Sequence, residues 1–459
     1  MSNRRNTPFY NAVDLLSRRR FLASGALAAG ALGLTACGDQ QTVAIQVSPT
    51  PTPTPASSPT PTPAPLPQLP PFVAKKYEPN LKNAIVAGEE IVDHFSKVLD
   101  TPSALIHAVR AFGRKYKRAD GSNTVDHLCA TCAEEKPANG RNLVHFKRAN
   151  YEVHENSFLK TFIEAGVPFE EPVLAGANKY TLKDVADHAK LLFRIDPNNL
   201  AKFEPNYTRE HLPWGLIAFS NLMKGGAGSW TNAWNEKIDL LEVVDKAALE
   251  FETLCSAVAT SEASGAEITD AFHKAASDYT CFGGHFIYSL VACVANGYTG
   301  RNLANRVNKL LDLNIYRTAH EWANIEKIYL SRIDGPISPN PQEEAQIDAQ
   351  LKRVGVEKKM VIQMLSHKSI VKLNGHVFES VNFARLKKTF EPNADQQKLI
   401  QKGEQKLFES ITALRAMNLE GVKNFNAGQV NEVVIAVAHA VRGLKLLSAA
   451  NPDTNPRDI

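Results

Sequence analysis

Helical periodicity is the strongest constraint on the fold of this 459-residue chain. From residue 75 onward, apolar side chains recur at intervals of three and four residues, which places them on one face of a helix. The alternating apolar and polar residues that would indicate strands are scarce. Together these patterns predict an all-α fold for residues 75–459.

Local signals locate the start of several helices. Thr101-Pro102 combines an N-cap residue with proline at the first helical position, which predicts a helix from there to about Tyr116. Asp239, followed three residues later by Glu242, predicts a capped helix start. Further amphipathic helices are expected over residues 80–99, 181–194, 268–279, 284–296, 302–330, 343–388, 393–418 and 427–449.

The body of the chain reads as one large helical domain, because no second proline-rich linker interrupts residues 75–459. Two sub-lobes that meet near residues 335–342 are the alternative. The segments "GHFIYS" at 284–289 and "GHVFES" at 375–380 share Gly, His and Ser in register, and each is expected to begin the apolar part of a helix. Such repetition is similar to α/α toroids or barrels of helical hairpins, in which a ring of helix ends forms a concave site. Coincidence is the other explanation of the match.

A short apolar run follows the arginines near the N-terminus. Arg18, Arg19 and Arg20 precede the sixteen residues Phe21–Ala36. This run is shorter than the roughly 20 apolar residues of a membrane span, and it has the layout of a secretory signal. The string "SRRRFL" from residue 17 resembles the twin-arginine signal of bacterial proteins, with Arg18 and Arg19 as the twin arginines. The resemblance implies that residues 1–36 are a signal peptide for export of an already folded protein.

The end of the apolar run resembles the bacterial lipobox. Leu34, Thr35 and Ala36 precede Cys37, as an aliphatic residue and two small ones precede the lipidated cysteine of that family. The resemblance implies that Cys37 is acylated (palmitate) and anchors the protein in the lipid bilayer of a bacterial cell envelope, facing the periplasm or the cell surface. An uncleaved anchor helix with an incidental cysteine is the alternative.

Residues 37–74 form a Thr/Pro-rich linker. Eleven of the chain's 26 prolines lie between Pro49 and Pro71. Alternating Thr-Pro favours extended polyproline II at ~3.1 Å per residue, so this segment predicts a semi-rigid spacer on the order of 75 Å long. A ligand for a proline-binding domain is the alternative.

The charge distribution argues against a nucleic-acid partner. The formal net charge is +4, and residues 1–36, with five arginines and one aspartate, already account for it. The remainder of the chain therefore carries no net charge, whereas nucleic-acid binding usually needs a basic face. We expect no nucleic acid among the partners.

Cysteines offer two candidate sites besides Cys37. Cys129 and Cys132 form a single C-x-x-C pair, which outside the cytoplasm would be a disulfide or a redox pair. Cys281 and His285 lie one helical turn apart on one face and, with a third ligand, would hold zinc (Zn²⁺) with an open coordination position. The alternative for both is that these cysteines are buried core residues.

Histidines and their neighbours suggest acid–base chemistry. His285 with Tyr288, and His376 with Glu379, are i,i+3 pairs that share a helix face. A histidine beside a carboxylate or a phenol suits proton transfer near neutral pH, and His154 is the further candidate. The alternative is that these histidines cap helices or are hydrogen-bonded core residues.

Two functions follow from these patterns. The first is an exported, membrane-anchored lipoprotein whose helical domain binds a protein or polysaccharide partner or a ligand, which predicts a large exposed apolar patch. The second is an envelope enzyme of α/α toroid type that uses His/Glu/Tyr acid–base or zinc-assisted chemistry on a polymer or peptide. The enzyme requires His285 and His376 to lie within about 15 Å of each other, because proton transfer acts over contact distances.

Overall fold

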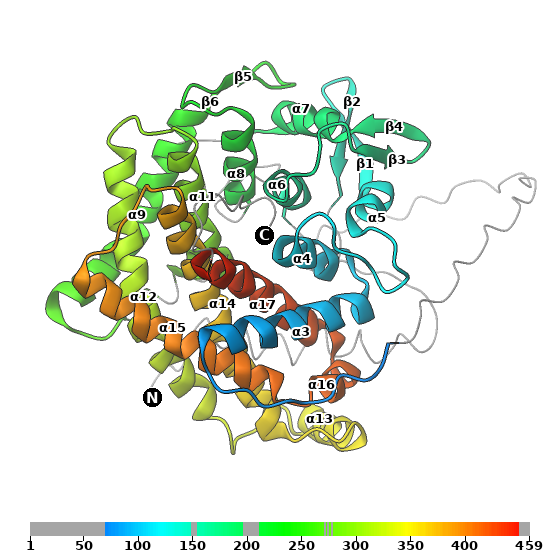
Figure 1. The fold of residues 1–459 in the computed structure, drawn as a ribbon, viewed down its shortest axis with the longest axis vertical. Helices are drawn as coiled ribbons and strands as arrows, with labels where there is room; N and C mark the ends of the chain where they lie inside the picture. Colours follow the sequence, from blue (N-terminus) through cyan, green and yellow to red (C-terminus); the bar gives the residue numbers. More distant parts are fainter. Residues whose placement is uncertain are drawn as a thin grey trace, which may run out of the picture.

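The computed structural model describes residues 69–147, 154–195, 211–269, 272, 275–276 and 279–448 (Figure 1). The predicted signal peptide with Arg18 and Arg19, the lipidation site Cys37 and nearly all of the predicted linker lie outside these residues. The predicted helix at 268–279 is described only in part.

Two long helices, α14 (Lys358–Leu386) and α17 (Ala427–Ser448), lie side by side in the middle of the fold (Figure 1). Glycines allow their close approach. A Cβ atom on Gly443 would lie 2.8 Å from the backbone nitrogen of Glu379, and one on Gly375 would lie 2.9 Å from the Cβ of Ala440. The helices packed around this pair are α3 (Leu81–Leu99), α4 (Pro102–Phe112), α11 (Gly284–Ala295), α12 (Leu303–Leu330), α15 (Ala394–Arg415) and α16 (Leu419–Phe425).

The remaining elements complete the fold at its periphery. One of them is the long helix α9 (Leu240–Ser264). The others are shorter: α5 (Thr124–Thr131), α6 (Ser157–Glu164), α7 (Leu182–Leu192), α8 (Leu212–Leu222), the 3₁₀ turn η1 (Thr280–Gly283) and α13 (Pro341–Arg353). Three antiparallel hairpins are β1 (Ala133–Ala138) with β2 (Arg141–Phe146), β3 (Pro172–Ala175) with β4 (Asn178–Thr181), and β5 (Ser229–Thr231) with β6 (Lys237–Asp239). Their registers pair Ala133 with Phe146, Pro172 with Thr181 and Ser229 with Asp239.

The all-α prediction is confirmed, with fourteen α-helices in the described ranges and strands only in these three hairpins. The predicted helix starts are confirmed as well. The Thr101 side chain accepts from the backbone N–H of Ala104, and that of Asp239 accepts from the N–H of Glu242. The single helix expected over 343–388 is wrong, because Gly355, at φ +65°, ends α13 before α14 begins.

The described helices do not close into a barrel of hairpins, because α14 and α17 fill the centre that such a ring would enclose (Figure 1). Gly284 does begin α11, as expected. Gly375 instead lies in the middle of α14, because apolar residues continue on its N-terminal side. The two matching segments therefore are not equivalent starts of repeated hairpins.

One apolar core includes side chains from both sides of residues 335–342, such as Leu310 in α12 and Val377 in α14. None of the helices within the described ranges combines the length and the apolar character needed to cross a membrane.

A buried carboxyl group in α15 gives the fold a specific pH dependence. Burial raises the pKa of Glu404 to about 7, and its Oε1 atom has no hydrogen-bond partner among the described residues. Because the folded state holds this proton more tightly than the unfolded chain, the group favours folding below about pH 4 and loses that contribution as the pH rises through 7. We expect Glu404→Gln to raise the free energy of unfolding by about 1–3 kcal/mol at pH 8 and to change it little at pH 4.5.

Urea unfolding followed by circular dichroism at both pH values measures this effect. Glu409→Gln, in the more exposed part of the same helix, is the control and should shift the curves by less than about 0.5 kcal/mol at either pH. An equal gain at pH 4.5 and pH 8 would contradict the assignment.

Candidate functional site

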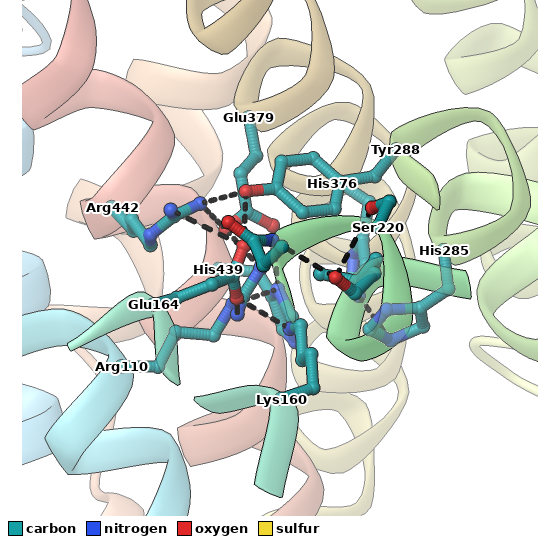
Figure 2. Close-up of polar contacts among 12 residues, drawn as sticks. Arg110, Lys160, Glu164, Ser220, His285, Tyr288, His376, Glu379, His439 and Arg442 are labelled. Carbon is teal, nitrogen blue, oxygen red and sulfur yellow. Dashed lines mark hydrogen bonds and ion pairs between the residues drawn. The ribbon is translucent and has the colours of Figure 1, made fainter. Parts of the chain in front are cut away.

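A network of buried ions lies where α4, α6, α11, α14 and α17 meet (Figure 2). Arg110 contacts Glu164 and Glu379, each at 2.6 Å between nitrogen and oxygen. Arg442 donates to Glu379 at 2.5 Å and to the Tyr288 hydroxyl at 3.0 Å, and that hydroxyl donates to Glu164 at 2.5 Å. Each of these five side chains is less than one-tenth exposed. Water therefore screens the attraction between the arginines and the glutamates very little.

The arginines keep both glutamates of this network ionised. Burial alone raises the pKa of Glu164, but Arg110, Lys160 and Arg442 outweigh it and bring the pKa to about 2. The pKa of Glu379 is likewise lowered, because Arg110 and Arg442 overcome its burial. Burial raises the pKa of Tyr288, which therefore remains a neutral phenol. The centre is a permanently charged scaffold at neutral pH.

Three histidine rings adjoin this scaffold. His376 Nε2 lies 3.1 Å from His285 Nε2, and the rings of His376 and His439 stack at a centroid distance of 3.9 Å. Burial lowers the pKa of all three imidazoles, that of His376 to about 3. All three rings are therefore neutral near pH 7, the form that can ligate a metal or accept a proton.

Neighbouring acceptors define the tautomers of His376 and His439. His376 Nδ1 donates to the backbone carbonyl of Lys372 at 2.6 Å, which leaves its Nε2 with a lone pair facing His285. His439 Nδ1 lies 2.8 Å from the Glu379 carboxylate and 3.2 Å from Arg110 Nε. The carboxylate accepts only from a protonated Nδ1, whereas Arg110 Nε donates only to an unprotonated one. We assign the proton to Nδ1 because the carboxylate contact is the shorter of the two. His439 Nε2 is then a lone-pair atom, and it has no partner among the described residues.

Cys281 reaches the same place from a strained turn. Cys281 and Phe282 adopt left-handed backbone angles, with φ of 54° and 56°, and Gly283 continues at φ 84°. Such angles are costly for residues other than glycine and persist at functional sites when the surroundings enforce them. Here the buried Arg317 donates to the Phe282 carbonyl at 2.9 Å and holds the turn.

Two glycines bring the turn and α11 close to their neighbours. A Cβ atom on Gly283 would lie 2.7 Å from the Phe251 ring, and one on Gly284 would lie 2.5 Å from the Cβ of His376. The Gly-Gly pair therefore allows α11 to approach α14 closely enough for His285 to meet His376.

Cys281, His285 and His376 together form a candidate metal site. Their ligand atoms, one sulfur and two nitrogens, all lie within 4.8 Å of one another. In a tetrahedral zinc site with Zn–N bonds of about 2.0–2.1 Å, two nitrogen ligands are about 3.3 Å apart. The 3.1 Å separation of the two Nε2 atoms is close to that spacing. The backbone carbonyl that accepts from His376 Nδ1 is the outer partner that metal-bound histidines usually have.

A cavity of about 70 Å³ adjoins these residues. Its wall includes Cys281, His285 and His439, which contribute from η1, α11 and α17. Arg110, Lys160 and Lys372 also line it, and Trp214 forms an aromatic side. A space of this size admits a small molecule or the end group of a larger one.

The structure unites four of the residues predicted for acid–base chemistry. His285, Tyr288, His376 and Glu379 all belong to the buried centre, and the separation of the two histidines is far below the 15 Å limit set by the enzyme hypothesis. His154 stacks on Trp214 at a centroid distance of 4.0 Å and lines the cavity, with Trp214 between it and His285.

The C-x-x-C pair lies elsewhere. Cys129 and Cys132 are buried in and just after α5, both carry free thiols, and neither lines the cavity. Burial raises the pKa of both thiols, whereas a reactive redox cysteine needs a lowered one. Both residues belong to the main apolar core, which agrees with the alternative that these cysteines are buried core residues.

Several residues of the site were missed from the sequence. They are Arg110, Lys160, Glu164, His439 and Arg442. Of these, His439 and Arg442 carried a usable signal, because they interrupt the apolar stretch "VVIAVAHAVRGL" of α17 at i,i+3 spacing. A polar pair inside such a stretch must find buried partners.

Comparisons of the chain with protein-family models, with curated proteins and with solved structures find no match.

Proposed function

We propose that the helical body is a metal-dependent hydrolase that acts outside the cytoplasm. The convergence of Cys281, His285 and His376 beside a cavity carries the proposal. Three protein ligands that leave a fourth position for water are the arrangement of catalytic rather than structural zinc sites. A metal in that position lowers the pKa of its bound water and produces a nucleophile at neutral pH.

His439 supplies the base that such chemistry needs. Glu379 orients its ring through Nδ1, and its Nε2 lone pair is buried in the wall of the same cavity. A metal held by Cys281, His285 and His376 would supply an activated water. His439 Nε2 would accept a proton from the attacking water as its oxygen bonds to the electrophilic carbon or phosphorus, and would return that proton to the leaving group as the bond to that group breaks.

The binding-protein hypothesis has less support. It expects a large exposed apolar patch, whereas four large apolar side chains are exposed among the described residues. They are Val73, Phe169, Leu249 and Leu330. The cavity volume also indicates that only the end group of a polymer or peptide would enter.

We place this enzyme in the bacterial cell envelope, tethered to the bilayer through acylated Cys37. The support is the leader's resemblance to twin-arginine and lipobox signals and the Thr/Pro-rich spacer after it. Export after folding fits a buried metal site, because the ligands converge only in the folded chain.

Metal analysis tests the enzyme proposal. We expect the exported full-length protein to carry about one zinc or similar ion per chain by mass spectrometry. Cys281→Ser and His285→Ala should each lose most of it, with affinity at least 10-fold weaker. His320→Ala is the matched control, because His320 lies on α12 and its ring bonds locally, to the Tyr316 carbonyl.

The far-ultraviolet circular dichroism of each variant shows whether it has folded. Absence of metal from the wild-type protein, or full retention of metal in a folded His285→Ala/His376→Ala double variant, would overturn the proposal.

A further inference from the structure

We propose that the substrate of this site carries a small oxyanion, a carboxylate or phosphate group, which binds in the cavity against Lys160 and Arg110. The inference rests on the proposed hydrolytic function and names the class of substrate. It follows from the charges that line the cavity, from the donors left on Lys160 and from the cavity's size.

Positive charge predominates on the cavity wall. Among the described residues that line it, Arg110, Lys160 and Lys372 stand against the single carboxylate of Glu432. Glu432 is already paired with Lys372, at 3.0 Å between Oε2 and Nζ. The wall therefore presents the remaining two cations, Arg110 and Lys160, to whatever occupies the cavity.

The buried ions behind the wall do not cancel this charge. Arg110, Lys160 and Arg442 together carry three positive charges, whereas Glu164 and Glu379 carry two negative ones. An unbalanced charge that is shielded from water is costly unless a counter-ion joins it. A bound oxyanion would complete the balance.

Lys160 has donors available for that oxyanion. Its side chain is 1% exposed, and its ammonium lies 3.2 Å from Glu164 Oε2, the same oxygen that Arg110 contacts at 2.6 Å. An ammonium has three N–H donors, and one shared oxygen occupies at most one of them. Lys160 therefore faces the cavity with unused hydrogen-bonding capacity.

The size of the cavity and the His439 Nε2 atom in its wall fit the same ligand. A cavity of about 150 Å³ accommodates the six carbons of benzene, so one of about 70 Å³ suits roughly three non-hydrogen atoms. That is the size of a carboxylate group or of the part of a phosphate group that would enter. His439 Nε2, which is buried and has no hydrogen-bond partner in the described part of the chain, lies in the same wall and would meet the water or the leaving group beside the anion.

Calorimetric titration of the metal-loaded, full-length protein tests the inference. The probes are acetate, inorganic phosphate and acetamide, the last a neutral match for acetate. We expect acetate or phosphate to bind at least 10-fold more tightly than acetamide, and the stronger of the two identifies the oxyanion. Lys160→Met should weaken anion binding at least 10-fold, Lys160→Arg should retain it, and the exposed Lys183→Met is the control.

The outcomes separate this inference from the proposed function. Binding of both acetate and phosphate no tighter than that of acetamide, or unchanged anion binding in folded Lys160→Met, would overturn the inference while the metal content stays intact. The wild-type comparison of the probes decides the question even if Lys160→Met does not fold. Loss of the proposed function would instead appear as wild-type protein without metal.

Discussion

Replacing Arg442 with methionine should lower the free energy of unfolding by about 3–5 kcal/mol. Arg442 is 4% exposed and contacts Glu379 at 2.5 Å and the Tyr288 hydroxyl at 3.0 Å. Methionine fills much of the same volume but leaves Glu379 with less compensating charge in a region without water. Removal of one partner from a buried ion network is far more costly than replacement of the whole network.

Two further variants identify the source of that loss. Arg301→Met removes an arginine of similar reach whose side chain is 55% exposed, and it should cost less than about 1 kcal/mol. Addition of Glu379→Gln to Arg442→Met replaces the carboxylate that has lost its 2.5 Å partner by a neutral amide of similar shape and should restore at least about 1 kcal/mol of the loss. Stability is measured by urea unfolding at pH 7. A loss below 1 kcal/mol for Arg442→Met, or no recovery in the double variant, would contradict the electrostatic explanation.

Helical periodicity predicted most of the fold because each helix has an apolar face and its own start signals. The 28-residue α12, expected over 302–330, runs from Leu303 to Leu330. The break between α13 and α14 was missed because a lone glycine inside an apolar pattern does not reveal its φ angle. The three hairpins were missed because their strands have only three to six residues, too few for an alternating pattern to stand out.

The sequence predicted the site only where two polar side chains at i,i+3 spacing interrupt an apolar helix. His285 and His376 were found in this way, yet their contact spans 91 residues of sequence and no local pattern encodes it. Arg110 and Glu164 gave no sequence signal, because charged residues of short helices such as α4 and α6 usually lie on the exposed face. Burial by α14 and α17 is a tertiary effect, so only the assembled fold reveals their role.

Replacing both Arg18 and Arg19 with lysine should abolish export of the protein from a bacterial cytoplasm, the largest effect we expect from any change in the leader. Lysine keeps the positive charge of the segment, so any loss reflects recognition of the arginines themselves rather than electrostatics. The matched control is Arg4→Lys with Arg5→Lys, because that pair lacks the "FL" that follows Arg20. Cell fractionation with immunoblotting measures the outcome, and unchanged export of the Arg18/Arg19 variant would contradict twin-arginine recognition.

Cys37→Ser separates export from anchoring. Its hydroxyl cannot form the thioether that carries the lipid, so incorporation of labelled palmitate should fall to background while the protein still leaves the cytoplasm.

Combined with metal analysis, the leader variants test why a folded protein would be exported. Because Cys281, His285 and His376 come from two helices and a turn that meet only after folding, we expect the precursor retained by Arg18→Lys/Arg19→Lys to contain metal already. A folded, metal-free precursor would instead place metal loading after export and remove that reason for the twin-arginine route.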